Sequence, residues 1–216
     1  MSDLKVKDKT SSLIIYVFGK GYVGKNELIY KFINFIPSEE YEQNKYKSNI
    51  NIEGKDYELE IYETPGEEDY QNMSDMWISL GEGFLLVFSI NEKESFELIQ
   101  CKYHRILKRK HGIEVPIVLV GNRIDSEGER EVSFDEAAEL AYSWGIEYTE
   151  TCTKTNLNCK EPFEVIAKEI LIFRKGKLKE YRKKLKKKGK KKIGELAHKY
   201  IPDYNKMVDL FKFINY

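Results

Sequence analysis

The glycine-rich segment Gly19–Asn26 (GKGYVGKN) has residue types and a spacing that suit the binding of phosphate groups. It follows the apolar run of residues 12–19 and precedes an apolar stripe at helical spacing, so it is expected to join a buried strand to a helix. Glycines permit a tight turn whose N–H groups point inward, and with the helix N-terminus they attract anions. Lys25 would neutralise the outer phosphates. The alternative, an ordinary glycine turn with an exposed lysine, is disfavoured by this position between strand and helix.

Asn26 stands where this motif normally carries Ser or Thr, whose hydroxyl ligates Mg²⁺. An amide oxygen can ligate a hard cation, but the longer side chain places it differently from a hydroxyl. We therefore expect weakened Mg²⁺ binding. Because the ion bridges the outer phosphates, the triphosphate should lose more affinity than the diphosphate.

The elements that must position this loop alternate between apolar runs and helical stripes. Strands are expected over residues 12–19, 49–52, 57–62, 83–90, 115–121 and 146–148, and helices over 26–36, 94–110, 134–144 and 161–173. Ser133 is expected to cap the third helix, with Glu136 three residues on. The order predicts an α/β fold: a mostly parallel six-stranded sheet with one antiparallel edge strand and helices on both faces, followed by a basic helical C-terminal extension. Ligands of such sheets bind at the carboxyl ends of the strands.

Three further segments lie at those strand ends: residues 63–69 (ETPGEED), 122–125 (NRID) and 150–155 (ETCTKT). Together with the phosphate loop, and in the same order, they resemble the DTAGQE, NKxD and ETSAK motifs of the Ras family, over roughly residues 12–172. The resemblance implies a P-loop NTPase fold and a small GTPase that binds GTP and GDP and acts as a signalling switch. It also implies effector and regulator proteins as partners.

The resemblance also implies which residues bind the guanine base. Asp125 would accept hydrogen bonds from the ring N1–H and the exocyclic amine, which adenine does not offer in that arrangement. Asn122 would support the base and tie its loop to the phosphate loop. The stem of Arg123 would cover one face of the base and Lys154 the other, while the Thr153 N–H would reach the guanine oxygen.

The other residues of the implied nucleotide site are Gly19, Gly21, Tyr22, Val23, Gly24, Lys25, Asn26, Glu27, Gly66 and Cys152.

The departures from the family pattern concern metal binding and hydrolysis. Glu63, the second metal position beside Asn26, replaces an Asp that holds Mg²⁺ through water. Glu67, expected to be catalytic together with Lys25, stands where a Gln normally orients the attacking water. Residues 38–47 lack the threonine that the family closes on Mg²⁺. GTP hydrolysis is therefore expected to be weak or atypical, and the alternative is a pseudo-GTPase that holds GDP or GTP without cycling.

The charge of the chain is divided between a body and a tail. Residues 174–192 hold thirteen Lys and Arg and one acid, a net charge of +12, so the rest of the chain carries −12. We expect a flexible N-terminus (1–11), a Ras-like domain (12–174), a polybasic segment (175–192) and an amphipathic helical segment (193–216). The three cysteines show no regular spacing and favour a reducing compartment.

The basic segment is expected to bind an anionic membrane surface through residues 175–216, and a solvated charge run is the alternative. Nucleic acid is disfavoured because no aromatic residues are interleaved through the lysines. Residues 193–216 carry apolar positions at helical spacing that suit a membrane interface, a partner or the domain itself. The expected location is cytoplasmic and peripheral at the inner face of the plasma membrane, without a prenylation motif, since no cysteine follows Cys159.

Overall fold

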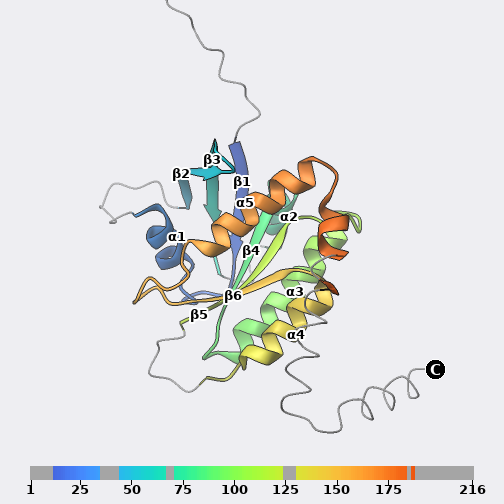
Figure 1. Ribbon diagram of the computed structural model, residues 1–216. Helices are drawn as coiled ribbons and strands as arrows, with labels where there is room; N and C mark the ends of the chain where they lie inside the picture. The colour runs from blue at the N-terminus through green and yellow to red at the C-terminus, as the bar shows by residue number, and fades with distance from the viewer. Residues whose placement is uncertain (1–11, 35–43, 67–70, 124–129, 184–185, 188–216) are drawn as a thin grey trace, which may run out of the picture.

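The computed structural model describes residues 12–34, 44–66, 71–123, 130–183 and 186–187. Within these residues the chain forms a six-stranded sheet with the order β2-β3-β1-β4-β5-β6 (Figure 1). The strands are β1 (Ser12–Phe18), β2 (Lys45–Ile52), β3 (Lys55–Glu63), β4 (Gly83–Ser89), β5 (Ile117–Asn122) and β6 (Glu147–Thr151). The edge strand β2 pairs with β3 in an antiparallel hairpin, and all other neighbours are parallel. The predicted sheet, including its antiparallel edge strand, is confirmed.

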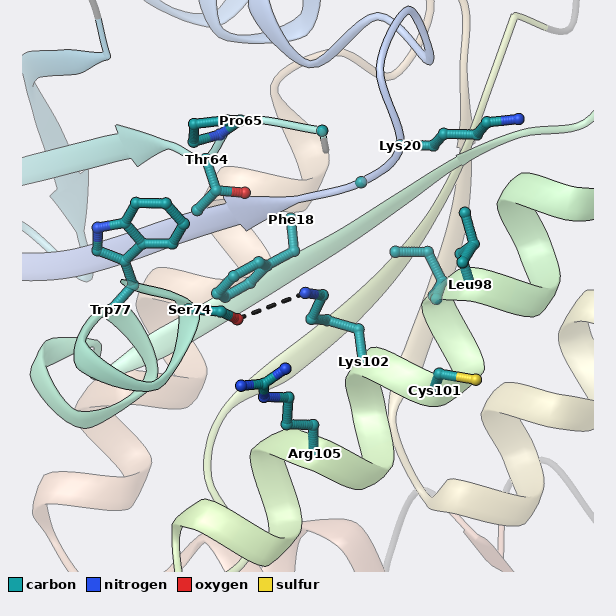
Figure 2. Close-up of a pocket in the computed structure, with 13 residues that line it drawn as sticks. Phe18, Lys20, Thr64, Pro65, Ser74, Trp77, Leu98, Cys101, Lys102 and Arg105 are labelled. Atoms are coloured by element: carbon teal, nitrogen blue, oxygen red, sulfur yellow. Dashed lines mark hydrogen bonds between the residues drawn. The ribbon is translucent and has the colours of Figure 1, made fainter. Parts of the chain in front are cut away.

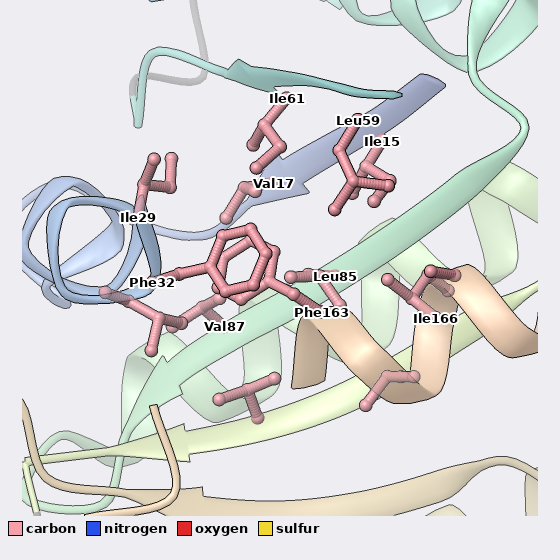
Figure 3. Packing of buried hydrophobic residues seen from close by; sticks show 14 of the residues in the cluster. Ile15, Val17, Ile29, Phe32, Leu59, Ile61, Leu85, Val87, Phe163 and Ile166 are labelled. Carbon is pink, nitrogen blue, oxygen red and sulfur yellow. The ribbon is translucent and has the colours of Figure 1, made fainter. Parts of the chain in front are cut away.

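Helices cover both faces of the sheet (Figure 1). They are α1 (Lys25–Ile33), α2 (Gln71–Leu80), α3 (Lys93–Arg109), α4 (Phe134–Trp144) and α5 (Glu161–Arg174). The cluster on one face joins α1 and α5 to the strands, and the rings of Phe32 and Phe163 stack there with centroids 4.2 Å apart (Figure 3). The other face holds side chains of α2, α3 and α4. The two clusters fix the sheet from which the loops of the site extend.

The sequence predicted most elements correctly and missed a few extensions. Ser133 caps α4 as expected, with its hydroxyl oxygen accepting from the Glu136 N–H at 3.1 Å. The prediction for β2 was too short because its first half alternates lysines with Tyr46; Lys47 pairs with Glu58 across the hairpin at 3.2 Å. Helix α2 was not predicted. Residues 178–183 and 186–187 are helical, in agreement with the expected basic helical extension, although the sequence did not place the start of that helix. Helix α1 ends at Ile33, with Asn34 as its C-cap in the left-handed region, so the prediction of a helix over 26–36 was too long; residues 35 and 36 lie outside the described ranges.

Glu169 of α5 is fully buried, which is unusual for a carboxylic acid. Burial raises the pKa of Glu169 to about 7, although the charge of Arg182 acts in the opposite direction. The folded protein therefore binds a proton at this group more tightly than the unfolded chain, whose carboxyl has the ordinary value of 4.5. The neutral acid is compatible with the fold, and its ionisation costs stability.

The substitution Glu169→Gln is expected to raise the free energy of unfolding at pH 8 and to leave it almost unchanged at pH 5. Because the folded pKa lies above the unfolded one, the native protein loses stability as the pH rises from about 5 through 7, by up to about 3 kcal/mol. Glutamine does not titrate and escapes that loss. Urea unfolding at both pH values measures the difference. The exposed Glu164→Gln on the same helix is the control, and an equal pH dependence of the Glu169→Gln variant and the native protein would contradict the assignment.

Candidate nucleotide-binding site

Lys25 lies at the start of α1, where the glycine-rich loop ends, and it is only 5% exposed. Its ammonium donates to the carbonyl oxygens of Gly19 and Lys20, both at 3.0 Å. The carboxylate of Glu63 lies 3.8 Å away, and burial lowers the pKa of Lys25. A buried cation surrounded mainly by backbone is poorly compensated, so the site favours an anion at this position.

Gly24 sits at the N-cap of α1 in the left-handed region, with φ of 92°, and no side chain caps the helix. A Cβ added there would lie 2.3 Å from Asn122 Nδ2, so both the backbone conformation and the available space require glycine. The uncapped helix leaves its first N–H groups directed at the loop, which is the arrangement that binds phosphate.

Asn122, the last residue of β5, joins the end of its own strand to the phosphate loop and to the end of β6. Its side-chain amide donates to the carbonyl oxygen of Val23 at 3.0 Å and accepts from the Thr151 hydroxyl at 2.9 Å. It is fully buried. The phosphate loop, the end of β5 and the end of β6 are therefore held in one hydrogen-bonded unit, as the predicted tie between loops requires.

The end of β3 lies directly against the phosphate loop. Thr64 is buried, and both its N–H and its hydroxyl donate to the carbonyl oxygen of Val17, at 3.1 and 3.0 Å. Gly66 approaches so closely that an added Cβ would lie 2.1 Å from the backbone nitrogen of Gly21. The chain at Gly66 is therefore packed directly against the loop that would carry the phosphates.

The two positions predicted as metal ligands are bonded to each other. In the amide orientation that satisfies both groups, Asn26 donates to Glu63 Oε2 at 2.6 Å and to Oε1 at 3.0 Å. Burial raises the pKa of the Glu63 carboxyl, while Lys25 and Asn26 act in the opposite direction. Asn26, Glu63 and Lys25 thus form one polar cluster beside the phosphate loop.

The predicted base-binding residues lie partly outside the described residues. Arg123 is described and exposed, with φ of 70°, whereas Asp125 and the predicted catalytic Glu67 fall outside the described ranges. In the loop after β6, Cys152 is buried and its sulfur accepts from the Thr155 N–H at 3.2 Å. Thr153 is half-buried and Lys154 is exposed.

The rest of the phosphate loop presents both buried and exposed side chains. Val23 is fully buried, and Glu27 is exposed in the first turn of α1. Tyr22 is 94% exposed and has a φ of 64°, which is uncommon for a residue other than glycine. The structure therefore places the ring of Tyr22, which the sequence analysis counted among the nucleotide-binding residues, in solvent beside the loop.

Sequence reasoning missed several residues that support the site. Thr151 fixes Asn122, as described above. Arg130 forms a bidentate pair with Glu150 at 2.7 and 2.8 Å, holding the chain beyond the predicted base loop against β6. Glu150 belongs to a recognised motif, but Arg130 lies in no motif and carries no local signal.

A cavity of about 220 Å³ lies beside the loop, between the ends of β1 and β3 and the helices α2 and α3 (Figure 2). The basic side chains that line the cavity interact with neighbouring residues: Lys102 donates to the Ser74 hydroxyl at 3.4 Å, and Arg105 pairs with Asp75 at 2.9 Å. Lys20 pairs with Glu92 at 2.5 Å. Gly19, Lys20 and Gly66 are among the residues that line the cavity, so it adjoins the phosphate loop.

A glycine-lined turn between a buried strand and a helix, closed around a buried lysine, defines a P-loop nucleotide-binding protein. Comparison with known proteins narrows the class. The sequence model described as the Ras family matches residues 14–172. The chain is 38% identical over 191 residues to the Ras-related protein ralB-A of Xenopus laevis, covering 85% of this chain and 92% of that protein. It is 36% identical over 176 residues to the Ras-related protein O-RAL of Diplobatis ommata, covering 79% and 85%.

The chain therefore belongs to the Ras family. It is a small GTPase, a signalling switch that binds guanine nucleotide and hydrolyses GTP. Proteins of this family also bind regulators and effectors.

The substitution Asn122→Ala is expected to lower the free energy of unfolding by about 2–3 kcal/mol, because it leaves the Val23 carbonyl and the Thr151 hydroxyl without their buried partner. Thr151→Val, the matched control, removes only one of the two bonds and is expected to cost about 1 kcal/mol. Urea unfolding measures both variants. If Thr151→Val cost as much as Asn122→Ala, or if neither lowered stability, the joining role of Asn122 would be wrong.

Proposed function

We propose that this GTPase holds guanine nucleotide chiefly through its phosphate loop and the buried ammonium of Lys25, with a reduced contribution from Mg²⁺. The observation that carries the proposal is the direct contact between Asn26 and Glu63, the residues at the two metal positions. On this proposal the triphosphate state is weakened more than the diphosphate state, and GTP hydrolysis is slow.

The donor set fits Mg²⁺ poorly. Mg²⁺ requires near-ideal octahedral geometry with oxygen ligands at about 2.0–2.1 Å. Asn26 offers an amide in place of a hydroxyl, and in the bonded orientation its nitrogen faces the Glu63 carboxylate. The same carboxylate lies 3.8 Å from the Lys25 ammonium, which compensates part of its charge. The two side chains therefore satisfy each other without an ion.

The chain's own groups can supply the binding. The N–H groups of the loop and the uncapped start of α1 attract the phosphates, and Lys25 is held above the loop by two carbonyls. Asn122 keeps the phosphate loop in register with the loops that follow β5 and β6. Asp125 is proposed to select guanine, with Arg123 and Lys154 covering the base.

The proposed deficit in hydrolysis has two sources in the sequence. A bound Mg²⁺ would neutralise charge on the outer phosphates, and a weakened site supplies less of that neutralisation. Glu67 replaces the Gln that orients the attacking water, and its negative charge opposes the approach of a water to the γ-phosphate. The backbone of Gly66 remains next to the loop, so the nucleotide can still be sensed.

The proposal is tested by restoring the usual metal residues with the double substitution Asn26→Ser and Glu63→Asp. Chelation of Mg²⁺ by EDTA is expected to lower the GDP affinity of the native protein by less than about threefold and that of the double variant by at least about tenfold. The double variant should also bind GTP more tightly and hydrolyse it faster in a single-turnover assay. Titration calorimetry and rapid quench measure these quantities.

The matched control makes the same two exchanges on the β2–β3 hairpin, Asn51→Ser and Glu58→Asp, far from the loop. It should behave as the native protein does. A native protein that loses its GDP affinity in EDTA as strongly as the double variant does would refute the reduced role of Mg²⁺.

A further inference from the structure

The side chain of Lys20 joins the phosphate loop to the start of α3. Lys20 stands between Gly19 and Gly21, and its ammonium forms ion pairs with Glu92 Oε1 at 2.5 Å and with Glu94 Oε2. Both acids lie at the start of α3, 72 and 74 residues further along the chain. Figure 2 shows the Lys20 side chain extending toward this end of the helix. We call Lys20, Glu92 and Glu94 the loop clamp.

The start of α3 is a firm anchor for the loop clamp. Ser95 is fully buried, and its hydroxyl donates to the Glu92 carbonyl oxygen at 2.7 Å and accepts from the Ser89 N–H at 3.0 Å. The next residue, Phe96, is buried in the core. The first turn of α3 is therefore fixed to the end of β4, and the loop clamp ties the phosphate loop to the interior of the domain.

The peptide unit between Lys20 and Gly21 is a meeting point of the phosphate site. Its carbonyl oxygen, that of Lys20, accepts from the buried ammonium of Lys25 at 3.0 Å. Gly66 packs on the same unit, since a Cβ added to Gly66 would lie 2.1 Å from the Gly21 nitrogen and 2.7 Å from the Lys20 carbonyl carbon. The position of this one peptide therefore sets where the Lys25 ammonium lies and how closely the chain at Gly66 can approach.

The loop clamp acts at the boundary between the packed and the open part of the phosphate loop. Before the peptide, a Cβ added to Gly19 would lie 2.4 Å from the carbonyl oxygen of Val87 in β4. After it, a Cβ added to Gly21 would meet no atom of the described residues within 4 Å, and Tyr22 is almost fully exposed. A side-chain contact at Lys20 therefore restrains the loop just where packing on the sheet ends.

The loop clamp is suited to positioning more than to global stability. Its side chains are partly exposed, from 28% for Lys20 to 67% for Glu94, and such pairs add little to the free energy of unfolding. A loop that is held in its binding shape before the nucleotide arrives avoids part of the ordering cost of binding. Hydrogen bonds to the two acids raise the pKa of Lys20 to about 12, so Lys20 keeps its charge at neutral pH.

We propose that Lys20 is a positioning residue for nucleotide binding: held by Glu92 and Glu94, it fixes the peptide between residues 20 and 21 and, through it, the ammonium of Lys25. The motif marks Lys20 only as a variable position between two glycines, and the contact with α3 gives it a role. This role goes beyond the function proposed above and does not depend on how much of the binding Mg²⁺ supplies.

The role is tested with Lys20→Met, which removes the charge and keeps an unbranched side chain. The dissociation rate of fluorescently labelled GDP, chased with unlabelled GDP in excess Mg²⁺, should rise at least about threefold. Lys20→Arg keeps the charge and the reach to both acids, so its rate should stay within about twofold of the native rate. The matched control is Lys93→Met, which removes a lysine from the same end of α3, where Lys93 pairs with Glu136. It should behave as the native protein does.

Removal of the two acids distinguishes the loop clamp from a field effect of the charges. If Lys20 acted on the phosphates only through its field, the exchange Glu92→Gln with Glu94→Gln would remove repulsion and slow GDP dissociation. The loop clamp predicts the opposite sign, a rate that rises about as much as in Lys20→Met. In the triple variant the rate should be within about twofold of that in Lys20→Met, because the contact is already lost.

Three results would overturn the proposal: dissociation from Lys20→Met at the native rate, a loss in Lys20→Arg equal to that in Lys20→Met, or slower dissociation after the exchange of both acids. The urea midpoint of each variant should stay close to the native one. A fall of the midpoint in proportion to the dissociation rate would show a structural role instead. Because every rate is measured in excess Mg²⁺, the result is independent of the test for a reduced role of Mg²⁺.

Discussion

The buried ammonium of Lys25 is the constraint around which the site is built. It is held by two carbonyls of its own loop, with one carboxylate at the limit of ion pairing, so the protein maintains a cation that it compensates incompletely. Such an arrangement costs stability in the free protein and favours phosphate. The glycines, the position of Asn122 and the close approach of Gly66 all maintain the loop that surrounds this charge.

The need to compensate the buried ammonium of Lys25 also explains how the exchanges at the two metal positions can be tolerated. In the family pattern a hydroxyl and an aspartate leave room for an ion and its water, whereas here the longer Asn26 and Glu63 side chains reach each other. Their bond keeps a carboxylate beside Lys25, and on our proposal it reduces the need for a divalent cation. On the same proposal, the attraction for phosphate depends chiefly on the N–H groups of the loop and on the ammonium held by its carbonyls.

The fold was largely predictable from the sequence because each central strand is a continuous apolar run. Residues 83–89 form such a run, and the structure buries them along their whole length. The first half of β2 was not predicted because Lys45 and Lys47 interrupt its apolar pattern. In the structure these lysines form cross-strand ion pairs, which one segment of sequence does not reveal. The basic extension after α5 was expected to be helical, but among so many lysines only the structure distinguishes the buried Arg182 from its exposed neighbours. The Asn26–Glu63 bond joins two motifs that were each recognised but whose side chains could not be placed from sequence.

The central claim is tested most directly by the GDP affinity of Lys25→Met, measured by calorimetry in EDTA beside the native protein. Methionine fills similar space without charge, so the variant should fold. The account predicts that the native protein binds GDP without metal, that adenosine diphosphate does not displace it, and that Lys25→Met loses at least about thirtyfold in affinity. An affinity for GDP that survives the loss of the ammonium, or equal competition by adenosine diphosphate, would contradict it.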